Sequence, residues 1–117
     1  MNVPNIEKLK KTLDICIELN NSIGDMSEML VCQHTKEGFS AAADLMQIAI
    51  KTKDIKLFSD IFDKTRQLVA IKDKFDATIR REIIKQQDVF DRLIIKKLSN
   101  HPSFTIKVIL PNISKVK

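Results

Sequence analysis

The sequence is poor in the residues that make turns, aromatic clusters and disulfides. Its 117 residues include two glycines, three prolines, two cysteines and six phenylalanines, with no tryptophan or tyrosine. A β-sandwich or barrel needs a turn roughly every 8–12 residues, so this composition excludes that class and favours a few long helices. Two glycines cannot build a phosphate-cradling loop, and the zinc-protease and serine-hydrolase motifs do not occur. We therefore expect a noncatalytic protein without a cofactor or a metal site.

Long apolar runs and signs of secretion are also missing. No stretch approaches the roughly 20 apolar residues of a membrane span, and Glu7 and three lysines near the start do not fit a signal peptide. Cys16 and Cys32 lie among apolar residues without CxxC spacing, which indicates reduced, partly buried thiols. These features predict a cytoplasmic protein, in the host cytoplasm if it is viral, that makes no membrane contact.

The apolar periodicity predicts an all-α domain over residues 1–101. A first helix is expected to start near Pro4, since proline suits the first helical turn. Its apolar seam recurs every three or four residues, at Ile6, Leu9, Leu13, Cys16, Asn20 and Ile23. Gly38 predicts a turn, followed by a second helix from about Phe39 to Lys51. Asp54 is the expected N-cap of the next helix.

Residues 55–98 carry an apolar stripe close to the 3.5-residue period of a coiled coil, without glycine or proline. The stripe predicts either one long helix or two stacked helices. A continuous helix would be about 66 Å long, which exceeds the width of a small domain. We expect the chain either to bend back near Gln86 and Gln87 or to pack its far end against another copy.

The pattern changes in the C-terminal segment, residues 102–117. Phe104, Ile106, Val108 and Leu110 alternate with other residues, which predicts a short strand over 103–110 that ends at Pro111. A lone strand would pair with other chains, lie along a helix as an extended arm, or become ordered only on a partner. We therefore expect a homo-oligomer. The residues expected at its interface are Leu57, Phe58, Ile61, Phe62, Leu68, Phe75, Ile79, Phe104, Ile106 and Val108.

Positive charge is concentrated after residue 79. Residues 80–117 hold nine basic and three acidic side chains, whereas the whole chain has a net charge of +5. Such a patch fits double-stranded DNA, although a lysine-rich end that only meets solvent is the alternative. Because no aromatic residues are interleaved with these cations, the patch would contact phosphates without recognising base sequence. The candidate nucleic-acid contacts are Arg80, Arg81, Lys85, Arg92, Lys96, Lys97, Lys107, Lys115 and Lys117.

One stretch resembles a known family. The helix-forming run AAADLMQIAIK at 41–51, its polar connector, LFSDIF at 57–62, Leu68 and KDKF at 72–75 are similar to the central helical hairpin of terminase small subunits of T-even-type tailed phages. Family members tend to have Pro-Arg in the connector, where this chain has Ile55 and Lys56. The resemblance implies a noncatalytic, ring-forming subunit that binds viral DNA during packaging and regulates a separate large motor ATPase.

Two other functions remain open on the sequence. A small helical regulatory adaptor would dock one helical face or its C-terminal arm on another protein. A histidine phosphotransfer bundle is suggested by the run from His34 to Gly38, which loosely resembles the His-x-Leu-Lys-Gly signature of that class. The run lacks the leucine and has Glu37 before the glycine. The simpler interpretation of His34 is an ordinary loop or turn histidine.

Overall fold

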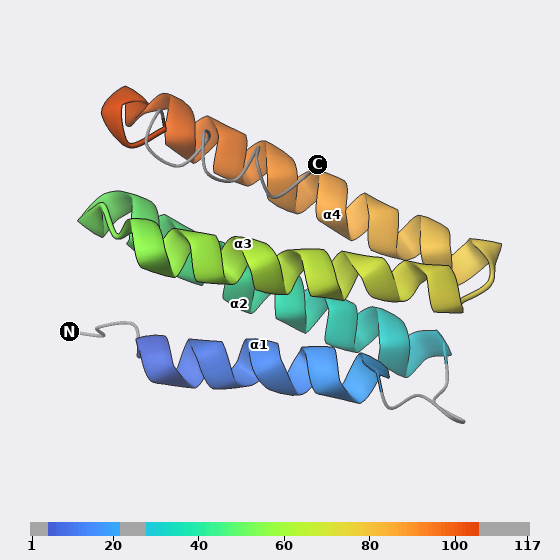
Figure 1. Ribbon diagram of the computed structural model, residues 1–117. Helices are drawn as coiled ribbons and strands as arrows, with labels where there is room; N and C mark the ends of the chain where they lie inside the picture. Colours follow the sequence, from blue (N-terminus) through green and yellow to red (C-terminus); the bar gives the residue numbers. More distant parts are fainter. Residues whose placement is uncertain (1–4, 22–27, 106–117) are drawn as a thin grey trace.

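The computed structural model describes residues 5–21 and 28–105, and these form helices joined by short turns (Figure 1). The helices are α1 (Ile6–Asn21), α2 (Glu28–Thr52), α3 (Ile55–Ala70) and α4 (Ala77–Ser99), with a 3₁₀ turn η1 (Ile71–Lys74) between the last two. A further helical turn covers 102–105. The part of the chain that the structure describes holds no strand, so the all-α prediction is confirmed there.

Helix α2 is the centre of the bundle. It packs against α1, α3 and α4, whereas α3 and α4 approach each other only slightly although they are neighbours in sequence. Figure 1 shows α1 and α4 on opposite sides of the α2–α3 pair, with α4 diverging from α3 along its length. A groove lies between α3 and α4.

Side-chain caps fix where three of the helices begin. The Oδ1 atom of Asn5 accepts a hydrogen bond from the Lys8 amide at 3.0 Å, and Asp54 Oδ1 accepts one from the Leu57 amide at 3.0 Å. Asp76 Oδ1 accepts from the amides of both Thr78 and Ile79. Each cap satisfies amides that the first helical turn leaves without a partner. The sequence prediction of Asp54 as an N-cap is thus confirmed.

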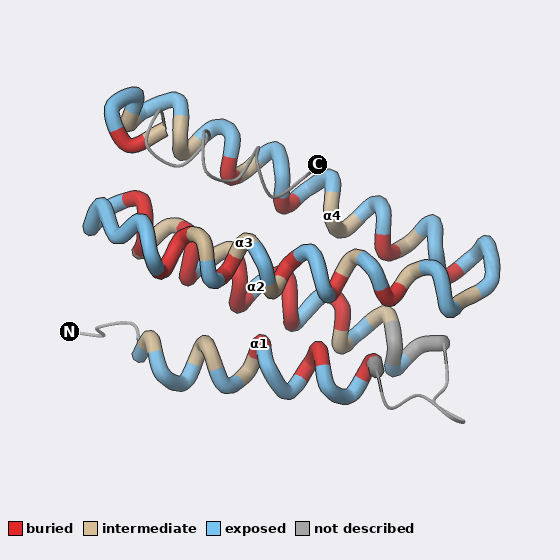
Figure 2. The backbone as a smooth tube through the Cα atoms, in the orientation of Figure 1, coloured by how far each residue is buried: buried red, intermediate tan, exposed pale blue. Residues whose placement is uncertain are grey.

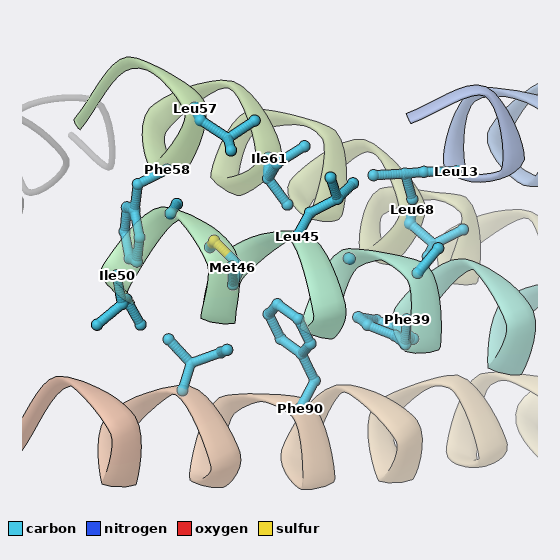
Figure 3. Packing of buried hydrophobic residues seen from close by; sticks show 14 of the residues in the cluster. Leu13, Phe39, Leu45, Met46, Ile50, Leu57, Phe58, Ile61, Leu68 and Phe90 are labelled. Carbon is cyan, nitrogen blue, oxygen red and sulfur yellow. The ribbon is translucent and has the colours of Figure 1, made fainter. Parts of the chain in front are cut away.

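The core is aliphatic, with aromatic contacts at its α4 side. The buried positions lie on the sides of the helices that face one another (Figure 2). Figure 3 shows residues of α2 and α3 interleaved at the centre, with Phe90 reaching in from α4. The Phe39 and Phe90 rings have centroids 5.5 Å apart. The large, fully buried apolar side chains of this core are Leu13, Leu45, Met46, Ile50, Ile61 and Leu68, whereas Ile83 belongs to a small separate cluster with Ile79.

The predicted turn at Gly38 is wrong, because α2 continues through this position. A β-carbon on Gly38 would lie 2.8 Å from Leu68 Cδ2 and 3.3 Å from Cys16 Cβ. Gly38 therefore allows α1 and α3 to approach α2 closely, at the cost of lower helix propensity. The glycine serves helix packing at this position, and a turn is not required.

The chain does bend back within 55–98, but the predicted place of the bend is wrong. Gln86 and Gln87 lie inside α4, and the chain reverses between Ile71 and Asp76 instead. There η1 tightens the end of α3, and Phe75 is extended with φ −119° and ψ 166°. Asp76 then caps α4. The segment is thus two antiparallel helices, and its stripe faces the chain's own core.

The predicted C-terminal strand is not seen in the described residues. Residues 103–105 are helical, and the Thr105 amide donates to the His101 carbonyl at 3.0 Å. Pro102 opens this turn, a position where its missing N–H costs nothing. The Thr105 hydroxyl also donates to the Leu98 carbonyl at 2.6 Å. The rest of the predicted strand, 106–110, lies outside the described residues.

Candidate functional site

A row of four exposed cations runs along the outer side of α4. Arg81, Lys85, Arg92 and Lys96 are all exposed, and they follow one another at intervals of four, seven and four residues. At 100° per residue these intervals keep the four within a sector of about 60°, and the row is about 22 Å long. The buried residues of α4, from Ile79 to Ile94, face the opposite side. We call these four residues the α4 basic row.

One acidic side chain lies beside the basic row. Asp88 Oδ2 pairs with Arg92 Nη2 at 3.2 Å, and the two side chains are 56% and 79% exposed. An ion pair so open to water contributes little to stability, so its breakage costs little. A phosphate could therefore replace Asp88 as the partner of Arg92.

The other predicted nucleic-acid contacts do not join the basic row. Arg80 Nη2 donates to the Phe75 carbonyl at 3.0 Å, which ties the guanidinium to the bend before α4. Lys97 is half-buried, one residue beyond the row and on another side of the helix. Lys107, Lys115 and Lys117 lie outside the described residues. The geometry thus brings together four of the nine predicted cations.

Most of the predicted oligomer-interface residues pack inside a single chain. Phe62 and Phe75 are half-buried, and Ile106 and Val108 lie outside the described residues. The remaining six are buried in the chain's own core: Leu57, Phe58, Ile61, Leu68, Ile79 and Phe104. Because α3 and α4 both turn the apolar stripe toward α2, the stripe is largely covered within one chain and alone gives no reason for a second copy. The large apolar side chains left exposed on α4 are Ile84, Val89 and Ile95.

An apolar groove lies between α3 and α4, and α2 supplies part of its floor. Its volume is about 680 Å³. The walls of this α3–α4 groove include Phe58, Phe62, Val69, Phe90, Ile94, Ile95 and Leu98. Charged side chains at the groove are Arg66, Lys72, Asp73 and Asp91. The groove cannot be predicted from the sequence, because its width depends on how far two neighbouring helices diverge.

Two of the charged groups interact closely with the groove. Arg66 places its guanidinium carbon 5.9 Å from the centroid of the Phe62 ring, within the range of a cation–π contact. Desolvation, reinforced by the negative charge of Asp88, raises the pKa of the Asp91 carboxyl above its usual value. A hydrogen bond with Gln87 acts in the opposite direction. Asp91 is exposed at the edge of the groove, so partial desolvation and its neighbour Asp88 together disfavour its charged form.

His34 lies within α2, not in a turn. Its ring is half-buried, and Nδ1 is buried without a hydrogen-bond partner among the described residues. Gly38 follows one helical turn later, on nearly the same face. However, Leu68 and Cys16 close the space beside Gly38. The space that the phosphotransfer hypothesis requires beside the histidine is thus filled on the Gly38 side.

Chemistry at a metal centre finds no support in the described residues, which contain no group of three or more His, Cys, Asp or Glu side chains placed to hold an ion. Among the described helices, none combines the length and apolar character needed to cross a membrane. Comparisons with protein-family models, curated proteins and solved structures find no match to the chain. Its function must therefore be inferred from its own surface.

Proposed function

We propose that the chain is a noncatalytic assembly protein that binds double-stranded DNA through the α4 basic row. The observation that carries the proposal is the clustering of Arg81, Lys85, Arg92 and Lys96 on one exposed side of a single helix. Duplex DNA carries one negative charge per ~1.7 Å of its axis, so a row of about 22 Å spans many phosphates. Each cation that meets a phosphate releases a condensed counterion, which supplies binding free energy.

The basic row suits backbone contact better than base readout. Its nearest exposed neighbours on α4 include the aliphatic side chains Ile84, Val89 and Ile95, and no aromatic ring is among them. Phosphate contacts position a protein on the duplex but carry no sequence information. Binding is therefore expected to be nonspecific and strongly dependent on salt.

A single row of four cations gives a weak contact, so the proposal includes several copies acting together. Linking weak sites in one assembly raises overall affinity through effective concentration. The resemblance of residues 41–80 to terminase small subunits supports a homo-oligomer in viral DNA packaging, working beside a separate motor ATPase. Since the apolar stripe is internal, the copies would meet through other surfaces.

The experiment compares two fourfold alanine variants in a titration of a fluorescent duplex followed by anisotropy. One variant replaces Arg81, Lys85, Arg92 and Lys96. The control removes as much charge from exposed positions elsewhere: Lys8, Lys11, Lys36 and Lys56. We expect a loss of affinity of at least about tenfold for the first variant and a smaller loss for the control. Equal losses of affinity in the two variants would mean that binding depends only on net charge, which would contradict the proposal.

The adaptor hypothesis is favoured by a different observation, the α3–α4 groove. A groove with apolar walls and a charged rim suits an apolar segment of a protein. Binding of a labelled apolar peptide, abolished by Ile95→Asp, would support an adaptor.

A further inference from the structure

The last described residues lie at one end of the α3–α4 groove. The Phe104 ring meets the Phe58 ring edge-on, with centroids 5.7 Å apart and planes at 76°. The Thr105 hydroxyl donates to the Leu98 carbonyl. Both Phe58 and Leu98 line the groove. The described part of the chain therefore ends beside the groove, at Thr105.

The sequence that follows is apolar. Ile106, Val108, Ile109 and Leu110 surround a single lysine, and Pro111 comes next. The groove also has exposed apolar surface, since Ile95 is 66% exposed and Phe62 and Leu98 are only half-buried. Contact between these apolar side chains removes surface from water, which favours burial of the segment in the groove. An apolar segment thus follows directly after the residues that lie at the end of an exposed apolar groove.

The lengths also agree. The groove is lined by α4 from Gln87 to Leu98, eleven residue steps that span about 16 Å along the helix. Residues 106–110 would span about 14 Å as an extended segment, over four residue steps. Residues 106–117 would span about 16 Å as a helix, over eleven steps. The segment can therefore reach along the groove in either backbone form.

Charge is compatible with the same occupant, because the groove is lined by two acidic and two basic side chains. Asp73 and Asp91 lie at the groove, and Asp88 is one turn of α4 from Asp91. The segment after residue 105 has three lysines and no acidic residue. A lysine beside Asp91 would offset the burial and the repulsion from Asp88 that disfavour its charge.

We propose that residues 106–110 of this same chain occupy the α3–α4 groove and cover its apolar walls. The C-terminal segment is then an internal plug, and any other apolar ligand of the groove must displace it. This inference does not depend on the proposed DNA contact, because the groove and the basic row use different residues of α4.

The direct test is NMR of the full chain with labelled methyl groups. We expect nuclear Overhauser effects between the methyls of Ile106, Val108 or Leu110 and those of Ile94, Ile95 or Leu98. They should be absent from a filtered spectrum of mixed labelled and unlabelled chains, which reports only contacts between copies. No such effects at all, or effects only in the filtered spectrum, would overturn the proposal. The second outcome would make another copy the occupant.

A second measurement uses Nile red, a neutral dye that fluoresces on apolar surfaces. In the full chain, Val108→Asp should release the plug and raise dye fluorescence several-fold. Ser114→Asp adds the same charge outside the plug and should leave the signal at the wild-type level. Circular dichroism checks that both variants keep their helices. Equal dye binding by wild type and Val108→Asp would show that residues 106–110 do not cover the groove.

Discussion

Gly38 of α2 faces Leu68 of α3 so closely that a β-carbon on the glycine would lie 2.8 Å from Leu68 Cδ2. Cys16 of α1 also lies against this position, with its Cβ 3.3 Å from the same added β-carbon. Three helices that are distant in sequence therefore converge on one residue without a side chain. Leu68 is fully buried, so its methyl group has little room to move.

Gly38→Ala should destabilise the chain by about 1 kcal/mol. Overpacking costs about 1–3 kcal/mol, while the better helix propensity of alanine returns up to about 1 kcal/mol. Urea unfolding followed by circular dichroism measures the change. Leu68→Val shortens the opposing side chain, so Gly38→Ala should cost less in that background. Stabilisation by Gly38→Ala in the wild-type background would contradict the close contact.

Asn20 and Thr35 form a buried polar link between α1 and α2. Asn20 Nδ2 donates to Thr35 Oγ1 at 3.1 Å, and their exposed fractions are 0% and 1%. Thr35→Val leaves the amide without this acceptor and should lower the free energy of unfolding by about 1–3 kcal/mol. The double variant Asn20→Leu/Thr35→Val should lose less than the two single losses added together. Strict additivity in this cycle would mean that the two side chains are not coupled.

Stability should depend on pH through Asp91. Its pKa is raised in the folded chain, so the folded state holds this proton more tightly than the unfolded state. The stabilising contribution is present below about pH 3.9, the ordinary Asp value, and is lost as the pH rises through the raised value. Asp91→Asn removes this loss, so the variant should gain stability relative to wild type between pH 4 and pH 7.

Urea unfolding at several pH values tests the role of Asp91. Asp60→Asn is the matched control, because Asp60 is an exposed carboxylate of α3. The control should follow the wild-type pH profile more closely than Asp91→Asn does. If the Asp91→Asn profile runs parallel to that of wild type, Asp91 is not the source of the dependence.

Cys16 should be far less reactive than Cys32 in the folded chain. Cys16 is 2% exposed, and its pKa is raised by burial and by the negative charge of Glu37. Both effects lower the amount of accessible thiolate. In a Cys32→Ser variant, we expect Cys16 to react with a thiol reagent at least about a hundredfold more slowly than in urea. Fast labelling of Cys16 in native buffer would mean that α1 opens readily from α2.

Local patterns of the sequence predicted part of this fold. The seam of the first helix is confirmed where it is described, with Leu13, Cys16 and Asn20 buried. The all-α class follows from long stretches without glycine or proline, and Asp54 caps its helix as expected. These features depend on interactions within a few residues, so spacing and residue type are enough to predict them.

The features that the sequence did not predict depend on contacts between distant segments. Gly38 was expected in a turn, but its small size is needed for contact with Leu68 of α3. Leu68 lies thirty positions later, so local spacing gives no sign of this contact. The bend at 71–76 has a local signal in Asp76, a good N-cap, but the continuous apolar stripe masks it. The groove cannot be read from α3 or α4 alone, since it depends on how the two diverge.

The sequence allowed part of the basic row to be predicted. Charge counts locate the positive segment, and the spacing of Arg81, Lys85, Arg92 and Lys96 keeps them near one another on a helix. The role of Arg80 at the bend could not be inferred from spacing, because it depends on the position of the Phe75 carbonyl. The structure thus narrows the candidate contacts to residues that share one exposed side.

The salt dependence of duplex binding tests the central claim most directly. The logarithm of the binding constant should fall linearly with the logarithm of the salt concentration, with a slope of about −0.9 for each phosphate contact. Replacement of Arg81, Lys85, Arg92 and Lys96 by alanine should make the slope shallower by up to about 3.6. Unchanged slope and affinity in that variant would contradict a DNA contact through α4.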